Sequence, residues 1–332
     1  MTSKFNNVYI KDAYTIGGIY ESEGPIAKYF DKVYNNDFYF GEKSFEKAES
    51  HILKEAIESL LNKCNLQEDK VDLVISGDLQ NQLAASDYAL RDINIPFLGI
   101  FSACATCGEG LAIASIYLEH KKNSNVIVAT SSHNLLSEKQ FRNPNEYGTP
   151  KPHTATFTST GAVSILVTST KTNLKIESVT IGKVMDLNQK DANNMGSIMA
   201  PAAADTIYRH LKDLKRDPSY YDLILTGDLG KYGKQILIDY MNEEYKINLN
   251  KNYDDCGLIL YDVNKQPVLA GASGPVSSAL VGFSYILNKL KTGKLNKILL
   301  VPTGAIFSPQ MSFQKESIPS IAHAISIERV EL

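Results

Sequence analysis

The stretch VDLVISGDL at residues 71–79 occurs a second time as YDLILTGDL at residues 221–229. The segments that follow each copy also repeat in order: a predicted strand, a turn of small residues, a helix and a further strand. In the first copy these segments span residues 97–131, and in the second copy they span residues 268–303. The turn of the first copy contains Cys104. Because internal repetition sets the architecture of a chain, the sequence predicts two related halves with a site where they meet.

The two halves are expected to cover residues 1–170 and 171–332 as one continuous unit, since no Pro-, Gly- or Ser-rich linker separates them. The repeated strands, such as residues 73–76, are short and continuously apolar. This pattern is typical of strands that are covered on both faces. The sequence therefore predicts an α/β protein with layered sheets and a pseudo-twofold relation between its halves.

Several other segments have a local signature. An amphipathic helix with a serine cap is predicted over residues 45–63. Pro201 is expected in the first turn of a helix that runs to residue 215. Residues 257–261 are predicted to be a strand and residues 1–43 an irregular strand-and-loop entry. Residues 133–153 are polar and contain several prolines, which predicts a long loop of the kind that often carries function.

The composition is that of an ordinary globular protein, with 332 residues, 43% apolar and 21% charged residues and a net charge of −3. A mildly acidic balance argues against nucleic acid as a partner, because nucleic-acid binding needs a basic surface. No apolar run approaches the ~20 residues of a membrane-spanning helix, and the N-terminal stretch MTSKFNNVYIKDAY has no apolar signal core. We therefore expect synthesis in the cytosol, where the four irregularly spaced cysteines would stay reduced.

A strand, a turn with a cysteine, a buried helix and a strand, followed by the same order again, is the layout of the thiolase superfamily. Within it, the chain resembles the stage V sporulation protein AD family of spore-forming Firmicutes over about residues 24–330. Ten stretches in order carry this resemblance: SGDLQNQ, FSACAT, ATSSHN, QFRNPNEYG, KPHTAT, MAPAAADTI, DLILTGDL, DDCGLILY, KLNKILLVPTGA and IPSIAHAISIER.

The resemblance implies a thiolase-like fold with five layers, α-β-α-β-α, that has lost acyl-transfer chemistry. It implies binding of dipicolinic acid (pyridine-2,6-dicarboxylate) and a part in the uptake of this ligand into the developing spore. The partners implied are membrane proteins of the same operon, at the inner membrane of the forespore and spore. A homodimer through strands next to the cysteine helix is expected. No cofactor is implied, although calcium could enter as a chelate of the ligand.

Cys104 is the first candidate for the ligand site. It follows a buried strand near the N-terminus of a helix, whose field favours a thiolate. The resemblance places it where thiolase-fold enzymes hold their nucleophile, whereas its position alone is equally compatible with a small buried apolar residue. Condensing enzymes of this fold place a His after the strand at 223–226 and an Asn or His in the turn at 271–274. This chain has Asp228 and Ser273 there, so covalent acyl chemistry is not expected.

Four further residues are candidates for lining the ligand pocket. His323 lies in the C-terminal hairpin, which in this fold passes over the site, although a single His in an apolar strand is often a core residue. His133 and Asn134 end the strand after the cysteine helix. Asp78, like its counterpart Asp228, ends a repeated strand, where ligands of α/β sheets collect. His133 and Asn134 could instead form a simple strand-ending turn, and Asp78 could satisfy backbone N–H groups of a turn.

Candidate cations for the ligand carboxylates are Lys139, Arg142, Lys151 and Lys183, although exposed lysines are usually only solvated. Cys104 and Cys107 form one C-x-x-C pair, which without a second ligand pair does not predict zinc, so no metal site is expected. No glycine-rich nucleotide motif occurs in the chain.

The sequence thus favours a non-enzymatic binding protein for dipicolinic acid, with or without calcium. Two alternatives stay open. One is a thiolase or condensing-type acyltransferase that uses Cys104 as its nucleophile. The other is a scaffold that recruits membrane partners without binding a ligand.

Overall fold

The computed structural model describes residues 2–141, 150–249 and 251–331. Most of its strands join one twelve-stranded sheet, whose main path runs β11-β10-β13-β16-β9-β2-β8-β6-β4-β5. One side of the path consists of β5 (Phe97–Gly99), β4 (Leu73–Gly77), β6 (Asn125–Ser132), β8 (Gly161–Thr168) and β2 (Tyr9–Gly17). The other side consists of β9 (Leu174–Thr180), β16 (Ala324–Arg329), β13 (Lys297–Val301), β10 (Leu223–Thr226) and β11 (Tyr253–Asp255).

The two sides of the path have the same topology. On one side β4 pairs in parallel with β5 and β6, and β8 pairs antiparallel with β6 and β2. On the other side β10 pairs in parallel with β11 and β13, and β16 pairs antiparallel with β13 and β9. The halves meet at β2 and β9, where Tyr9 is opposite Lys175. This symmetry confirms the repeat that begins with the two GDL stretches.

One predicted equivalence is wrong. By its pairing, the counterpart of β5 is β11 (Tyr253–Asp255), and not a strand at residues 268–272. That segment ends in the two-residue strand β12 (Ala272–Ser273), which pairs with β7 (Phe157–Thr158) outside the large sheet. The extra sequence of the second half therefore lies between β11 and the helix that starts at Pro275.

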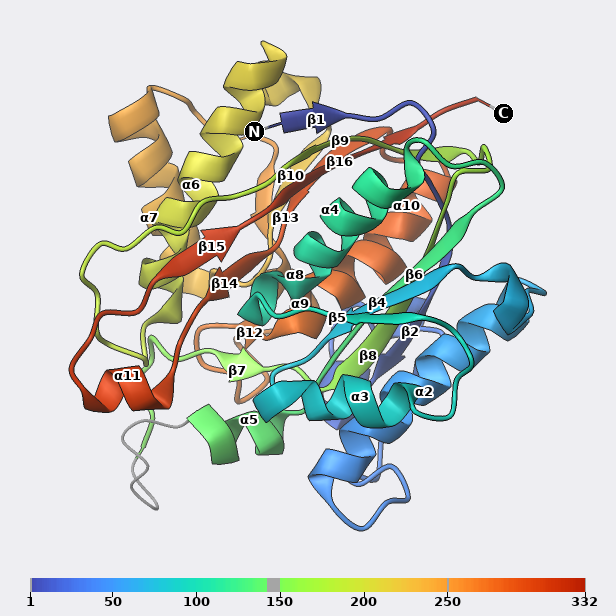
Figure 1. The fold of residues 1–332 in the computed structure, drawn as a ribbon. Coiled ribbons are helices and arrows are strands. Elements are labelled where there is room, and N and C mark those ends of the chain that lie inside the picture. The colour runs from blue at the N-terminus through green and yellow to red at the C-terminus, as the bar shows by residue number, and fades with distance from the viewer. Residues whose placement is uncertain (1, 142–149, 250, 332) are drawn as a thin grey trace.

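Helices form three layers around the two sheet halves (Figure 1). One outer layer consists of α2 (Phe45–Lys63) and α3 (Ala84–Leu90), and the other of α6 (Met195–Leu214) and α7 (Gly230–Tyr245). The central layer consists of α4 (Thr106–Leu118), α9 (Pro275–Leu280) and α10 (Leu287–Lys291), the last two joined by the π-helical segment η6 (Val281–Ile286). The five-layered, thiolase-like α/β fold is therefore confirmed.

Alternation along the strands produces these layers, because successive side chains of a strand point to opposite faces. Val74 packs in the outer core with α2, whereas the next residue, Ile75, packs in the central core with α4. In the second half, Ile224 packs in the outer core with α6, and Leu225 faces the central core. Strands that bury both faces have continuous apolar sequences, as observed here.

The central helix α4 lies between both sheet halves, and small residues allow this close packing. A Cβ atom on Gly110 would lie 2.7 Å from a methyl carbon of Val128 on β6. Thr106, Leu111 and Leu118 have no exposed surface. A helix that is apolar on all sides belongs in the middle of a fold.

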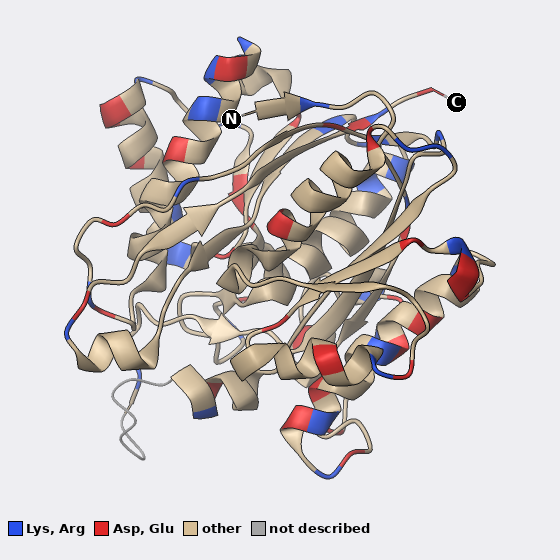
Figure 2. Cartoon of the chain, in the orientation of Figure 1, with Lys and Arg blue, Asp and Glu red and all other residues tan. Residues whose placement is uncertain are grey.

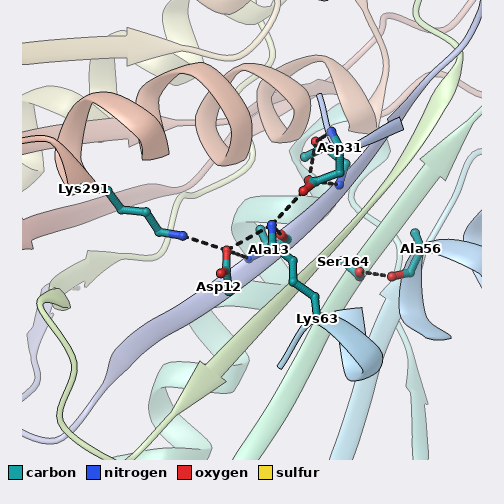
Figure 3. Close-up of polar contacts among 8 residues, drawn as sticks. Asp12, Ala13, Asp31, Ala56, Lys63, Ser164 and Lys291 are labelled. Carbon is teal, nitrogen blue, oxygen red and sulfur yellow. Dashed lines mark hydrogen bonds and ion pairs between the residues drawn. The ribbon is translucent and has the colours of Figure 1, made fainter. Parts of the chain in front are cut away.

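Polar contacts fasten the layers to the central strand β2, as Figure 3 shows. Lys291 of α10 lies 2.8 Å from a carboxylate oxygen of Asp12, and Lys63 of α2 donates to the carbonyl oxygen of Ala13 at 2.8 Å. Lys63 also pairs with Asp31 at 2.7 Å. Burial raises the pKa of Asp12, but hydrogen bonds from Lys291 and the Ala13 N–H outweigh it and leave the pKa below its usual value. Figure 2 shows most charged residues on the outer helices and loops.

Other sequence predictions had mixed outcomes. The helix over residues 45–63 is confirmed, and Ser44 accepts a hydrogen bond from the Lys47 N–H as its N-cap. Pro201 does not lie in a first turn, since α6 already begins at Met195. Residues 256–260 form a short helix, α8 (Cys256–Leu260), because the Asp255 side chain caps it by accepting the Gly257 N–H at 3.1 Å.

The strand-and-loop entry predicted over residues 1–43 contains the nine-residue strand β2, whereas α5 (Asn134–Phe141) lies within the segment 133–153 that was predicted to be a loop. The remaining elements are short: β1 (Thr2–Lys4), α1 (Ile19–Ser22), β3 (Lys32–Val33), β14 (Thr303–Ala305), α11 (Pro309–Phe313) and β15 (Ser320–Ala322). Among the described helices, none combines the length and the apolar character needed to cross a bilayer.

Candidate functional site

A cavity of about 120 Å³ opens where the turn before α4 meets β12 and the segments around β7 and β14. Phe101, Phe141 and Phe307 give it an aromatic wall. Cys104 and Ser273 also line it, as do Glu138 and Lys151, which form an ion pair. The cavity thus combines an apolar slot with one cation, one anion and several hydroxyl groups. The other lining residues are Leu79, Ala103, Ser137, Ala155, Thr156, Thr158, Ala192, Asn193, Met195, Met199 and Ala305.

The turn that presents Cys104 is tightly held. Ala103 has a left-handed backbone with φ of 49°, which is uncommon for a residue with a side chain and costs free energy. Thr106 offsets this cost, because its hydroxyl donates to the Ala103 carbonyl at 2.6 Å and accepts the Ser102 N–H at 3.2 Å. Gly304 of β14 packs on the same turn, where an added Cβ would lie 2.4 Å from the Ser102 carbonyl oxygen. The sulfur position is therefore fixed by both halves of the chain.

The surroundings of Cys104 disfavour a thiolate. Its sulfur lies 3.8 Å from the Ser273 hydroxyl oxygen. Burial raises the pKa of the thiol well above its usual value, and the nearby Asp228 carboxylate raises it further. A charged thiolate is the reactive form of cysteine. The field of the helix N-terminus, from which we predicted a favoured thiolate, is thus outweighed.

Asp228 is a buried carboxylate, 1% exposed, with neutral partners. It accepts hydrogen bonds from the Thr303 hydroxyl at 2.5 Å, the Ser273 hydroxyl at 3.3 Å and the Gly274 N–H at 3.2 Å. Burial raises its pKa to about 7, and the neighbouring carboxylate of Asp255 adds to the rise. Asp228 and Ser273 therefore stand beside the sulfur at the two positions where the resemblance places imidazole or amide groups in condensing enzymes.

His323 lies close to this region but is turned to other partners. Its Nδ1 accepts the Gly182 N–H at 3.2 Å, which assigns the proton to Nε2, and Nε2 lies 3.5 Å from the Ser102 hydroxyl oxygen. Burial lowers its pKa to about 4, so the ring is neutral near pH 7. His323 is not among the described residues that line the cavity, and both ring nitrogens have partners. Its predicted role in ligand binding has only this indirect link to the site, through Ser102.

The structure places Asp78 away from the cavity lining. Its carboxylate accepts the N–H groups of Gln80 and Ser86, each at 2.8 Å, and the Ser86 hydroxyl at 2.8 Å. Asp78 therefore holds the turn before α3, which was the alternative considered in the sequence. Of the two GDL aspartates, Asp228 and not Asp78 is the one beside the cavity.

His133 and Asn134 also lie behind the cavity and not in its wall. His133 has no exposed surface, and its Nε2 lies 2.9 Å from the Phe38 carbonyl oxygen. The Asn134 side chain donates to the Thr158 carbonyl at 3.1 Å, and the backbone N–H of Asn134 donates to the Thr160 hydroxyl at 2.9 Å. These bonds position β7, from which Thr158 reaches the cavity.

The candidate cations differ in their position relative to the cavity. Lys151 lines the cavity and pairs with Glu138. Lys139 is 70% exposed and pairs with Glu46 at 2.7 Å on the outer surface, and Lys183 is 60% exposed and pairs with Asp205 at 3.3 Å. Arg142 lies outside the described residues. Lys151 is therefore the described lysine that can meet a carboxylate in the cavity.

Cys107 and the described acidic residues do not add a metal site to the cavity. Cys107 is a free thiol with no exposed surface, and burial raises its pKa to about 12. Within residues 2–141, 150–249 and 251–331, no three His, Cys, Asp or Glu side chains are placed to hold a metal ion. The C-x-x-C spacing thus reflects one cavity-lining thiol and one core thiol.

Sequence reasoning missed the aromatic wall. Phe101 lies within FSACAT and could have been noticed there, but Phe141 and Phe307 come from a helix end and a C-terminal segment with no shared motif. Their rings lie 6.1 Å apart between centroids, at an angle of 59°. Tertiary structure alone brings them together.

Comparisons with known proteins identify the family. The stage V sporulation protein AD (SpoVAD) family profile matches residues 1–328. The stage V sporulation protein AD of Bacillus subtilis (strain 168) is 45% identical over 323 residues, covering 97% of this chain and 94% of that protein. The chain belongs to the stage V sporulation protein AD family. The resemblance in the sequence is thus confirmed, and this SpoVAD family member is a sporulation protein.

Solved structures similar to this SpoVAD family member support the fold. Cerulenin-bound OleA of Xanthomonas campestris has a TM-score of 0.62 and 15% identity, with 98% of this chain and 100% of that chain covered. The 3-oxoacyl-[acyl-carrier-protein] synthase III from Aquifex aeolicus VF5 has a TM-score of 0.54 and 14% identity, with 99% and 100% covered. At such low identities the likeness establishes a condensing-enzyme type of fold and not an activity.

Proposed function

We propose that this SpoVAD family member is a non-enzymatic binding protein for dipicolinic acid and takes part in its uptake into the developing spore. The observation that carries the proposal is the cavity, where three phenylalanine rings, a lysine and a thiol that favours its neutral form surround about 120 Å³. Dipicolinate is a planar aromatic ring with two carboxylates, so it needs an apolar slot, a cation and hydrogen-bond donors. Membership of a sporulation family agrees with this ligand.

The cavity volume favours a ligand with a single ring. A cavity of about 150 Å³ inside a protein core holds one benzene molecule. The cavity described here, about 120 Å³, is of the same order. A long acyl chain with its carrier arm would need a longer tunnel, so the size disfavours an acyl substrate. The ring of dipicolinate is of benzene size, and its two carboxylates would extend beyond the cavity towards its opening.

The charges around the cavity support a carboxylate ligand when Asp228 is protonated. Lys151 can donate a charge-assisted hydrogen bond to a carboxylate, and the Thr158 hydroxyl can donate a further bond. The buried Asp228 would repel a dianion when ionised, but its pKa of about 7 leaves it substantially protonated near neutral pH. A calcium chelate of the ligand would reduce the repulsion further, because the cation neutralises the carboxylates.

A condensing-type acyltransferase that uses Cys104 is the second candidate, favoured by the fold and by the place of the thiol in the cavity. Acyl transfer needs an activated thiolate and a base beside it. The raised pKa of Cys104, to which the Asp228 carboxylate contributes, disfavours the thiolate. We therefore propose that the acyl chemistry is lost.

We further propose that the protein is made in the cytosol and acts as a peripheral protein at the inner membrane of the forespore and spore. Moving a carboxylate into hydrocarbon is very costly, so dipicolinate uptake needs a membrane passage. Membrane proteins of the same operon would supply this passage, and the protein described here would deliver the ligand to it.

Isothermal titration calorimetry with dipicolinate, with and without calcium, tests the proposal. The Lys151→Met variant should weaken binding at least about tenfold, because it removes a charge-assisted hydrogen bond. Lys139→Met is the matched control: this lysine is also paired with a glutamate but lies outside the cavity, so its variant should bind within about twofold of the intact protein. Cys104→Ala and the core variant Cys107→Ala form a second matched pair.

Four outcomes would contradict the proposal or one of its parts. Absence of binding by the intact protein in both titrations would remove it, and equal binding by the two lysine variants would remove the assignment to this cavity. An acyl-sized mass increment after incubation with acyl-CoA, lost in Cys104→Ala, would favour the acyltransferase. Normal dipicolinate accumulation in spores that carry a folded Lys151→Met protein without ligand affinity would favour a scaffold.

A further inference from the structure

A second hollow, which we call the outer groove, lies beside the cavity and has a volume of about 290 Å³. Its lining comes from the turn at residues 79–83, from Phe101, from the end of α5 at Gln140 and Phe141, and from residues 307–310. In Figure 1 the elements next to these segments, α3, α5 and α11, share the lower edge of the molecule. The outer groove is therefore built by four segments of the chain that are separated in sequence.

The cavity and the outer groove share one wall. Leu79, Phe101, Phe141 and Phe307 line both hollows. The Phe101 side chain is 46% exposed, so its ring presents an open apolar surface. The tilted pair of Phe141 and Phe307 completes the wall. A planar aromatic molecule would find ring surfaces to stack on in either hollow.

The polar lining of the outer groove is neutral and rich in amides. It contains Gln80, Asn81, Gln82, Gln140 and Gln310, and no charged side chain among its described lining residues. The Gln140 side-chain amide donates hydrogen bonds to the Leu79 carbonyl oxygen at 2.8 Å and to the Asn81 side-chain oxygen at 3.1 Å. The Gln310 side-chain oxygen accepts the Ser308 hydroxyl at 3.2 Å, which leaves the amide nitrogen as the donor of this side chain.

The turn that carries Gln82 is held in an uncommon conformation. Gln82 has φ 63° and ψ 25°, and the next residue, Leu83, has φ 57° and ψ 39°. Two successive left-handed residues with side chains cost free energy that the surrounding packing must offset. Such local strain is commonly found in segments that hold a ligand. Here it holds the backbone of Gln82, one of the residues that line the groove.

We infer that the outer groove is a second, weaker site for the same planar aromatic carboxylate, occupied on the way to the cavity. The inference rests on the proposed function. Amide N–H groups donate to carboxylates without a fixed positive charge, so they hold an anion less strongly than Lys151 does in the cavity. Weak, reversible binding next to a tighter site, across a shared aromatic wall, raises the local concentration of ligand at the cavity.

The test uses crystals of the full chain soaked with 4-bromopyridine-2,6-dicarboxylate, whose bromine gives an anomalous signal. The expected result is one bromine peak in the cavity and a second, lower-occupancy peak in the outer groove. The variant Q82G/Q310A should lose the groove peak and keep the cavity peak. Glycine suits the left-handed backbone at position 82, and Gln310→Ala alone serves if the double variant does not fold.

A kinetic readout separates a transit site from a bystander site. In surface plasmon resonance with dipicolinate, Q82G/Q310A should lower the association rate about tenfold, as expected for losing hydrogen bonds to a carboxylate. Gln235→Ala, an exposed amide on α7, is the matched control and should leave that rate unchanged.

The outcomes distinguish the two proposals. A cavity peak without a groove peak, a groove filled by a second copy of the chain, or an unchanged association rate in Q82G/Q310A would overturn the inference and leave the proposed function standing. Absence of both peaks, together with absence of calorimetric binding, would overturn the proposed function.

Discussion

The substitution Asp228→Asn should stabilise the folded protein, and the gain should grow as the pH rises. Asp228 is 1% exposed, and its hydrogen-bond donors are the neutral groups of Ser273, Gly274 and Thr303. Burial raises its pKa from 3.8 to about 7. The unfolded chain therefore ionises this carboxyl at a lower pH than the folded protein does, and ionisation favours unfolding.

The magnitude follows from the pKa difference. Each unit corresponds to about 1.4 kcal/mol, so the rise from 3.8 to about 7 lowers the free energy of unfolding by roughly 4 kcal/mol at pH above 7. The penalty grows through the window from about pH 4 to 7 and is constant above it. Asparagine carries no charge and avoids the penalty. Its amide can donate to the Thr303 hydroxyl, which can accept as well as donate.

Urea unfolding at pH 5 and pH 8, followed by circular dichroism, measures the effect. The free-energy gain of Asp228→Asn over the wild type should be roughly 2–3 kcal/mol larger at pH 8 than at pH 5. Burial also raises the pKa values of Glu21, Glu49 and Asp255, but these groups are present in both proteins. The exposed Asp239→Asn is the control. A gain that does not change with pH, or a loss of stability at pH 8, would refute the reasoning.

Three further predictions concern reactivity, packing and assembly. Iodoacetamide should modify Cys104 at pH 8 at least about tenfold more slowly than free cysteine, because the pKa of this thiol is raised. Asp228→Asn should speed the reaction, and peptide mass spectrometry measures both rates. Rapid labelling of the native protein would contradict this prediction. Gly182→Ala places a Cβ 1.8 Å from the Ala322 carbonyl oxygen and should lower the free energy of unfolding in urea by about 3 kcal/mol. In the control Gly282→Ala the Cβ meets a flexible Leu300 methyl at 3.1 Å, so the loss should be less than about 1 kcal/mol. Equal losses would argue against the close contact at Gly182. Leu98, 42% exposed on the edge strand β5, should lie in a homodimer interface. Leu98→Glu should therefore give a monomer in light scattering, whereas the control Ile236→Glu on α7 should not. An unchanged mass for Leu98→Glu would exclude this interface.

The parts of the fold that follow local rules could be predicted from sequence. The repeated GDL strands and the helix over residues 45–63 each have a clear periodicity or cap, and they form as expected. The short apolar run at 257–261 fits a strand or a helix equally well, and the capping carboxylate of Asp255 decides for a helix. Residues 1–43 were predicted only as an irregular strand-and-loop entry, and the bounds of the nine-residue strand β2 were not predicted, because its pairing partners, β8 and β9, lie far along the chain.

The candidate site was predictable where a motif fixed a position and not where orientation mattered. Cys104 follows from its place between a strand and a helix. Asp78 and Asp228 are equivalent in sequence, but the direction of each carboxylate depends on which N–H groups the following turn offers. The contact of Lys151 with the cavity and the aromatic wall arise from tertiary packing, for which the sequence has no local signal.

The central helical layer has a consequence for how the chain is made. Its core combines residues of both halves, for example Ile75 and Leu111 from the first and Leu225 and Ile327 from the second. While the ribosome has released only the first half, the apolar surface of α4 that later meets β9 and β16 has no cover. The nascent chain should therefore depend on chaperones until its last strand is synthesised, and truncation within β16 should yield aggregates and not a stable half-protein.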